Sequence, residues 1–155
     1  MTRLGSRRWR AILLLLPACF RAATELAIAR IRHQFIRPGD IQAMNKRAGS
    51  GAHVVEDQDA LGAEGRALVD QVAFVLPRVA PRLPWRADCL IQAMAAQRWL
   101  RTRGIASSIS IGVRRSEEGE FESHAWLRQG KRIVTGGEIQ QFSPILTPDH
   151  RGKDG

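Results

Sequence analysis

Two side chains in the sequence have the chemistry of a nucleophile and of its base. Cys89 directly follows Asp88, whose carboxylate suits the N-cap of a helix, so the thiol is expected in the first turn of that helix. Unpaired amides and the helix dipole at such a position favour thiolate over thiol. His124 lies 35 residues further on, in the middle of an expected strand, where its imidazole can accept a proton. The spacing alone is a weak signal for thiol-dependent acyl transfer.

Hydrophobic periodicity predicts the elements that must position this pair. A helical stripe covers residues 60–79, and residues 89–103 form a buried central helix that ends at Gly104, because apolar residues occupy most of its circumference. After Gly104 the period changes to two, which predicts strands. These strands are residues 105–113, 121–128 and 131–135, with an edge strand at 142–146. Helices followed by an antiparallel meander define an α+β fold, with the cysteine-bearing helix packed on a small antiparallel sheet.

Positive charge is concentrated at the N-terminus. The net charge of the chain is +9, and residues 1–37 account for +7 of it, with eight arginines against the single acid Glu25. Such a segment suits anionic lipid, nucleic acid or an acidic peptide, or it is the solvated face of a helix.

The same segment also carries an apolar pattern. The stretch MTRLGSRRWR followed by AILLLLPACF has the outline of a secretory signal with a near-match to a lipoprotein cleavage box. The pattern nevertheless continues beyond it through Phe20, Ile31 and Phe35 at helical spacing. We therefore expect one amphipathic helix over residues 9–36, bent at Pro17, that docks on the domain or lies on a membrane. Its apolar run is too short to cross a bilayer.

Length and composition bound the remaining possibilities. A chain of 155 residues can bury a sizeable core, so a disulfide scaffold is excluded and Cys19 is expected in that core. We expect a basic helix and loop over residues 1–58, a core with the cysteine and the histidine over 59–147, and a polar tail over 148–155. The sequence shows no phosphate loop, no serine elbow and no histidines at metal-ligand spacing, so neither a cofactor nor a metal is expected. Aromatic residues make up only 6%, and we expect no nucleic-acid partner.

Three motifs resemble one known family. They are Pro84-Trp85-Arg86-Ala87-Asp88-Cys89-Leu90, Gly104-Ile105 and Ser123-His124-Ala125-Trp126-Leu127, in this order. Their combination resembles the lasso-peptide leader peptidases, the B component of lasso-peptide biosynthesis, within the transglutaminase-like superfamily. The resemblance runs from about Val69 to Leu146. It implies a papain-like or transglutaminase-like fold and a cysteine peptidase that removes a leader through an acyl-enzyme, with Cys89 as nucleophile and His124 as general base.

The third catalytic member of that family has no direct counterpart here. In the family it is an acid, usually Asp, on the strand after the histidine. If residues 129–130 form a two-residue hairpin turn, Thr135 lies opposite His124, and the acid's position falls on Thr135 or Gly136. The nearest acid is Glu138, and we predict that it folds back to orient the imidazole, with Thr135 or a backbone acceptor as the alternatives.

The resemblance also implies partners. The precursor peptide would bind through its leader, and an ATP-dependent lasso cyclase would use the freed amine. A separate leader-recognition protein is expected, because the N-terminal segment is helical rather than β-rich. We expect a cytoplasmic protein. Contact of its basic first helix with a membrane surface is left open as an alternative. The rival functions are a catalytically impaired leader-binding scaffold, another acyltransferase of the same class, and a basic module for membranes or nucleic acid.

Overall fold

Helices come first in the chain and strands follow. The structure is a computed structural model that describes the backbone of residues 3–37, 39–49 and 61–147, and side chains from residue 15 onward. The helical elements are α1 (Arg3–His33), α2 (Asp40–Arg47), α3 (Ala63–Val79), the 3₁₀ turn η2 (Ala80–Arg82) and α4 (Cys89–Arg101). The expected tail at 148–155 lies outside the described residues.

One antiparallel sheet follows the helices, in the strand order β3-β2-β1-β4. Its strands are β1 (Ser108–Arg115), β2 (Phe121–Gln129), β3 (Arg132–Thr135) and β4 (Ser143–Leu146). The expected α+β class is confirmed, and the last strand pairs with β1 at the edge of the sheet. The first strand begins later than the period-two pattern because the chain first leaves α4 through Gly104, whose φ is +70°.

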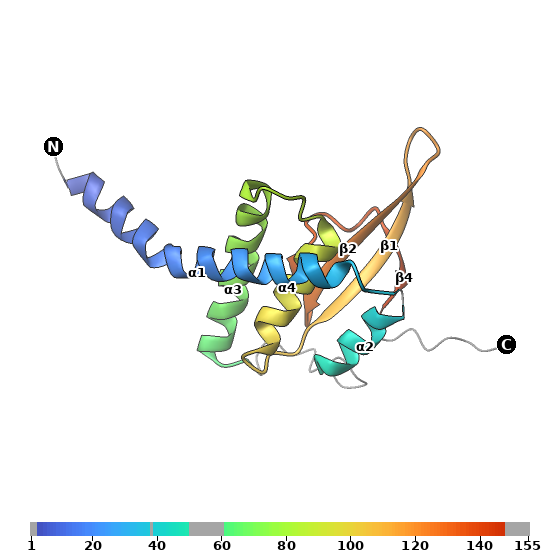
Figure 1. Cartoon of the computed structure of the whole chain (residues 1–155), viewed down its shortest axis with the longest axis horizontal. Helices are drawn as coiled ribbons and strands as arrows, with labels where there is room; N and C mark the ends of the chain where they lie inside the picture. The colour runs from blue at the N-terminus through green and yellow to red at the C-terminus, as the bar shows by residue number, and fades with distance from the viewer. Residues whose placement is uncertain (1–2, 38, 50–60, 148–155) are drawn as a thin grey trace.

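Helix α4 lies at the centre of the molecule. Helices α1 and α3 pack against it, and α4 in turn packs against β2, as Figure 1 shows. One hydrophobic cluster joins these elements, including Leu26 of α1, Val72 of α3, Ile91 of α4 and Leu127 of β2. Neighbours on several sides explain why apolar residues occupy most of the circumference of α4.

The β2–β3 hairpin has a different register from the expected one. Its turn consists of residues 130–131, one residue later than predicted, and the pairing is irregular next to Leu127. Thr135 lies opposite Leu127 rather than His124, so that prediction was wrong. The physical reason is the φ of +54° at Gly130, since glycine adopts this conformation without strain and so starts the turn.

Helix α1 packs on the domain through small residues. It contains Pro17, and Figure 1 shows that the helix changes direction about halfway along its length. Its buried apolar residues are Ala18, Ala22, Leu26 and Ala29. The larger apolar residues of the predicted amphipathic pattern, Phe20 and Ile31 among them, lie on the exposed side. Small side chains let α1 approach α3 and α4 closely, which the periodicity of the large residues did not indicate.

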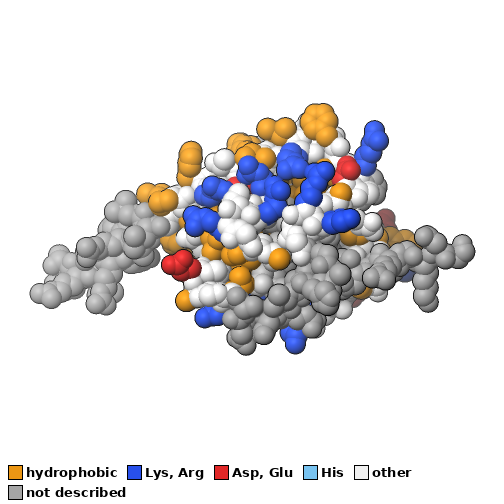
Figure 2. All heavy atoms as spheres, turned by 90° about the horizontal axis from the view of Figure 1, so that it is seen from below, with side chains coloured by type: hydrophobic (Ala, Val, Ile, Leu, Met, Phe, Trp, Pro, Cys, Tyr) orange, Lys and Arg blue, Asp and Glu red, His pale blue; other side chains and the backbone are white. Residues whose placement is uncertain are grey.

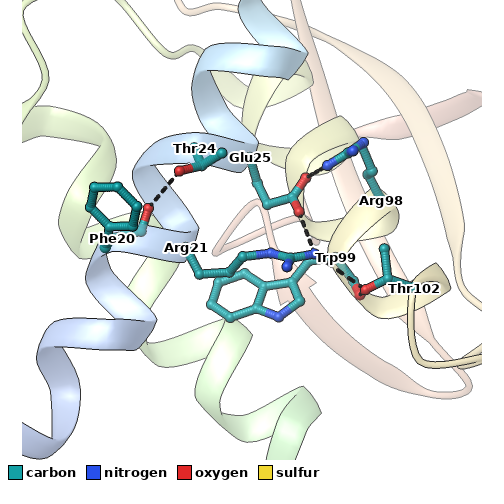
Figure 3. A network of polar contacts seen from close by, with 7 residues as sticks. All are labelled: Phe20, Arg21, Thr24, Glu25, Arg98, Trp99 and Thr102. Carbon is teal, nitrogen blue, oxygen red and sulfur yellow. Dashed lines mark hydrogen bonds and ion pairs between the residues drawn. The ribbon is translucent and has the colours of Figure 1, made fainter.

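A buried carboxylate fastens α1 to α4 (Figure 3). Glu25 is fully buried; its Oε1 lies 2.7 Å from Nη2 of Arg21, and Arg98 of α4 donates to its other oxygen. Arg21 also donates to Oγ1 of Thr102, at the end of α4, over 3.4 Å. Because a buried carboxylate is costly unless it is paired, this cluster favours α1 staying on α4.

The short helix α2, which the sequence analysis did not predict, is tied to the sheet by Asn45. The buried Asn45 side chain donates to the carbonyl oxygen of Ile109 and accepts from its N–H, both over 2.8 Å. Nε2 of Gln97 in α4 donates to Oδ1 of Asn45 over 3.0 Å. This amide therefore links α2, α4 and the start of β1.

Candidate active site

Cys89 is held at the start of α4 by contacts with its sequence neighbours. It is the first residue of the helix and is partly buried. Asp88 is the N-cap, as predicted: its backbone is extended and its carboxylate accepts from the N–H of Ile91 over 3.4 Å. Nε2 of Gln92 donates to the carbonyl of Ala87 over 2.8 Å. These bonds fix how the chain enters the helix, and hence where the thiol lies.

His124 is held by a main-chain oxygen. It lies in β2 opposite Gly112 of β1, and its Nε2 lies 2.6 Å from the carbonyl oxygen of Gly136. A carbonyl oxygen only accepts, so Nε2 carries the proton. In the neutral ring Nδ1 is then the nitrogen with a free lone pair, which is the tautomer that a general base acting through Nδ1 needs.

The two side chains considered for the orienting role do not contact that ring nitrogen. Thr135 is almost fully buried, and its hydroxyl has no hydrogen-bond partner among the described residues. Glu138 is exposed and makes no ion pair or hydrogen bond with a described residue. The last pair of the hairpin is Leu127 with Thr135. If β3 continued unbroken beyond that pair, Glu138 would lie opposite His124. The chain instead turns at Gly136 and Gly137, whose φ values are +111° and +59°.

An aromatic ring covers the imidazole. Phe142, just before β4, stacks on His124 with ring centroids 4.9 Å apart and planes inclined by 28°. Arg114 of β1 places its guanidinium carbon 5.1 Å from the centroid of Phe142. Nε of Arg114 lies 2.6 Å from a carboxylate oxygen of Glu122, and Arg114 also donates to the side chain of Gln141. The ring that restrains His124 is therefore itself restrained.

Close packing on Trp126 requires glycine at two positions near the histidine. A Cβ at Gly112 would lie 2.8 Å from the Trp126 ring, and a Cβ at Gly136 would lie 2.9 Å from the Trp126 Cα. Gly136 also has a φ of +111°, which favours glycine. An aspartate at position 136 is incompatible with this path of the chain. The carbonyl of Gly136 reaches His124 because no side chain separates this residue from Trp126.

The structure brings the three predicted site residues to one cavity. Cys89, His124 and Glu138 line an open cavity of about 670 Å³. The rest of its wall comes from α3, α4, β3 and the loop after it, through Ala73, Pro77, Gln92, residues 133–135, Gly136 and Gly137. A second open cavity shares Pro77 and Gln92 with the first and continues over the loop 83–88. The two cavities therefore adjoin at Pro77 and Gln92.

A helix that presents a cysteine and a strand that presents a histidine to the same cavity form the arrangement of cysteine-type acyl-transfer enzymes. Comparison with known families agrees with this class. The family model of the transglutaminase-like superfamily matches residues 23–147, from the last third of α1 to the residue after β4, and the chain belongs to this superfamily. No curated protein and no solved structure matches the chain.

The described part of the chain offers neither a membrane-spanning helix nor a metal site. None of its helices combines the length and the apolar character that a bilayer crossing requires. Its His, Cys, Asp and Glu side chains form no group of three that could hold a metal ion.

The sequence left a backbone acceptor open as one alternative for orienting His124, but indicated neither the Gly136 carbonyl in particular nor the contact with Phe142. For Gly136 a signal existed, because a glycine doublet directly after an expected strand indicates positive φ and a sharp turn. For Phe142 the neighbouring sequence carried no such signal, because the contact of its ring with His124 depends on the pairing of β4 with β1.

Proposed function

We propose that the chain is a cysteine peptidase that cleaves the leader from a lasso-peptide precursor. One observation carries the proposal: Cys89 in the first turn of α4 and His124, whose ring the Gly136 carbonyl holds, line the same open cavity. Membership of the transglutaminase-like superfamily supports cysteine-type acyl transfer. The resemblance of the motifs around both residues to leader peptidases supports the finer assignment.

In this proposal Cys89 is the nucleophile and His124 the general base. Nδ1 of His124 accepts the thiol proton while Sγ attacks the carbonyl carbon of the scissile peptide bond. The C–N bond breaks, a thioester forms, and the imidazolium returns the proton to the departing nitrogen. Water that gives a proton to Nδ1 then hydrolyses the thioester. The leader leaves with a new carboxylate and the core peptide with a free amine.

Backbone groups complete the proposed machinery. Amide N–H groups at the start of α4 stabilise the oxyanion of each tetrahedral intermediate. The Gly136 carbonyl has the orienting role, since it is the group bonded to Nε2 of His124. Glu138 lies on the exposed wall of the cavity and adds negative charge there without fixing the ring.

An extended peptide is the substrate that the two adjoining cavities suit best. The first cavity holds the thiol and the second is lined by the loop that carries Pro84 and Trp85, so together they offer contacts on one side of the scissile bond. In this scheme a separate leader-recognition protein delivers the precursor. An ATP-dependent lasso cyclase consumes the amine that cleavage releases.

The test is mass spectrometry of a precursor peptide incubated with the full chain and its leader-recognition partner. The precursor is one encoded next to this chain. We expect a leader-sized mass loss with the wild type and a fall in rate of at least about a thousandfold with Cys89→Ala or His124→Ala. Cys19→Ala is the matched control, because Cys19 is the other free cysteine, lies on α1 and does not line the cavity. This control should cleave like the wild type.

Three other results would decide against the proposal in different ways. Precursor bound but left intact by the wild type would favour the leader-binding scaffold. An amide product that contains an added amine, in place of a free leader carboxylate, would favour another acyltransferase. If Glu138→Gln lost as much activity as His124→Ala, the orienting role would belong to the carboxylate and not to the Gly136 carbonyl.

A further inference from the structure

The side of α1 that points away from the domain carries large apolar side chains. Four of them are exposed there: Leu16 (52%), Phe20 (78%), Ile31 (61%) and Phe35 (78%), the last in the turn after the helix. The spacings of four and eleven residues place Leu16, Phe20 and Ile31 on one side of the helix, where the partly buried Ala23 and Ala27 and the exposed Thr24 also fall. Figure 3 shows the Phe20 ring on the opposite side of α1 from Arg98. We call these four side chains the outer stripe.

The charges beside the outer stripe are all positive. At 100° per residue, Arg30 falls on one side of the stripe and Arg32 on the other, beside Arg21, which is paired with Glu25. The single acid of residues 1–37, Glu25, is buried and paired with Arg21 and Arg98, so it adds no negative charge to the surface of the helix. The sequence adds four arginines and no acid at residues 3–10, in the half of α1 that extends beyond the domain in Figure 1.

A small cavity next to this region is also lined by arginines. It lies between α1, α2 and α4, has a volume of about 70 Å³, and has no acidic residue in its lining. The arginines that line it are Arg32, Arg47, Arg98 and Arg101; of these Arg98 is paired with Glu25, and the other three make no ion pair with a described residue. Figure 2 shows Lys and Arg side chains gathered on one face of the molecule, with exposed apolar side chains along its border. A cavity of this composition suits a phosphate group.

We propose that α1 docks the protein on a bilayer that contains anionic phospholipid. The outer stripe enters the boundary between headgroups and acyl chains, and the arginines beside it bind headgroup phosphates. Charge complementarity selects this occupant: large apolar side chains flanked by cations, with the one acid buried, match an anionic lipid surface. The helix lies in the plane of the interface and does not cross it. This inference is independent of the proposed peptidase activity.

The test is cosedimentation of the full chain with vesicles of phosphatidylcholine alone or of phosphatidylcholine with phosphatidylglycerol. We expect binding to the anionic vesicles, weaker binding in high salt, and at least about tenfold weaker binding by the double variant Phe20→Ser/Phe35→Ser. Phe121→Ser is the matched control, since Phe121 is 77% exposed but lies on the β1–β2 hairpin. It should bind vesicles like the wild type.

A second pair of variants tests the arginines. Arg32→Gln/Arg101→Gln should weaken binding to anionic vesicles severalfold and leave the weak binding to phosphatidylcholine unchanged, because only the headgroup charge is lost. Arg103→Gln, an exposed arginine outside the cavity lining, is the control.

Two outcomes would overturn the inference. One is equal binding by the wild type and by Phe20→Ser/Phe35→Ser, with circular dichroism showing both folded. The other is failure to bind anionic vesicles while the same double variant loses capture of the leader-recognition protein. In that case the occupant of the outer stripe is a protein.

Discussion

Cys89 and His124, the proposed nucleophile and base, are positioned by different kinds of contact. Cys89 depends on residues next to it in the chain: the Asp88 cap and the bond from Gln92 to Ala87. His124 depends on residues that other strands and loops bring to it, namely Gly112, Gly136 and Phe142. A change near Cys89 therefore perturbs one helix end, whereas a change near His124 acts through the whole sheet.

The largest effect is expected where the support of His124 is tightest. In Gly136→Ala the new methyl group meets the backbone of Trp126, and overpacking of this kind costs about 1 to 3 kcal/mol, before the strain of the positive φ is added. The Gly136 carbonyl then moves away from Nε2, so leader cleavage should fall about a hundredfold or more. Urea unfolding measures the change in stability, and the cleavage rate of the folded fraction measures the change in catalytic rate.

Gly137→Asn is the control for that substitution. A Cβ at Gly137 meets nothing within 4 Å, and asparagine tolerates its φ of +59°. This variant should keep nearly all of its stability and activity. If both variants behaved alike, the contact between Gly136 and Trp126 would not be what positions the carbonyl.

An intermediate effect is expected at the ring that covers the imidazole. Phe142→Ala removes the stacking partner of His124 and the surface under Arg114, so the imidazole should sample more orientations and cleavage should slow about tenfold. Nitrogen-detected NMR of the histidine ring should show the Nε2–H tautomer in the wild type and a mixture in the variant. Phe121→Ala is the matched control, since the Arg115 guanidinium lies 5.6 Å from the centroid of the Phe121 ring and no histidine of the described residues stacks on that ring. An unchanged tautomer in Phe142→Ala would contradict this role.

The smallest effect is expected on the cysteine side. Asp88→Ala removes the side-chain cap of α4, which typically costs about 1 kcal/mol of stability, and should slow cleavage only a few-fold because Cys89 remains in the first turn. Asp88→Asn keeps an acceptor and should restore most of the loss. Thermal unfolding of the two variants measures the change in stability, and their cleavage rates measure the change in activity. A collapse of activity in Asp88→Asn would show that the negative charge of Asp88 matters beyond capping.

The same contrast explains how far the sequence could predict the site. The start of α4 and the Asp88 cap were predictable because the signals lie within a few residues of Cys89. The strand that carries His124 was predictable from its alternation. Its partners were not, because the hairpin register depends on where one glycine turns the chain, and a shift of one residue changes every pairing.

Helix α1 illustrates a second limit of sequence reasoning. The periodicity of large apolar residues correctly indicated a helix, but the buried side is the one with Ala18, Ala22 and Ala29. An apolar pattern does not say which of two apolar sides faces the core. Close packing against α4 and the pairing of Glu25 with Arg98 decide it, and both are tertiary contacts.

The bond between His124 and Gly136 also affects how this site can change by mutation. A main-chain oxygen is present whatever side chain the residue carries, so no single substitution deletes it as a substitution deletes a catalytic aspartate. Only a change in the path of the backbone removes it. If every position is substituted in turn and the variants are screened for activity, we therefore expect Gly136 to tolerate no replacement. No acidic residue should be equally sensitive to replacement. We therefore expect the proposed site to tolerate the loss of acidic side chains and to fail when one methyl group is added at Gly136.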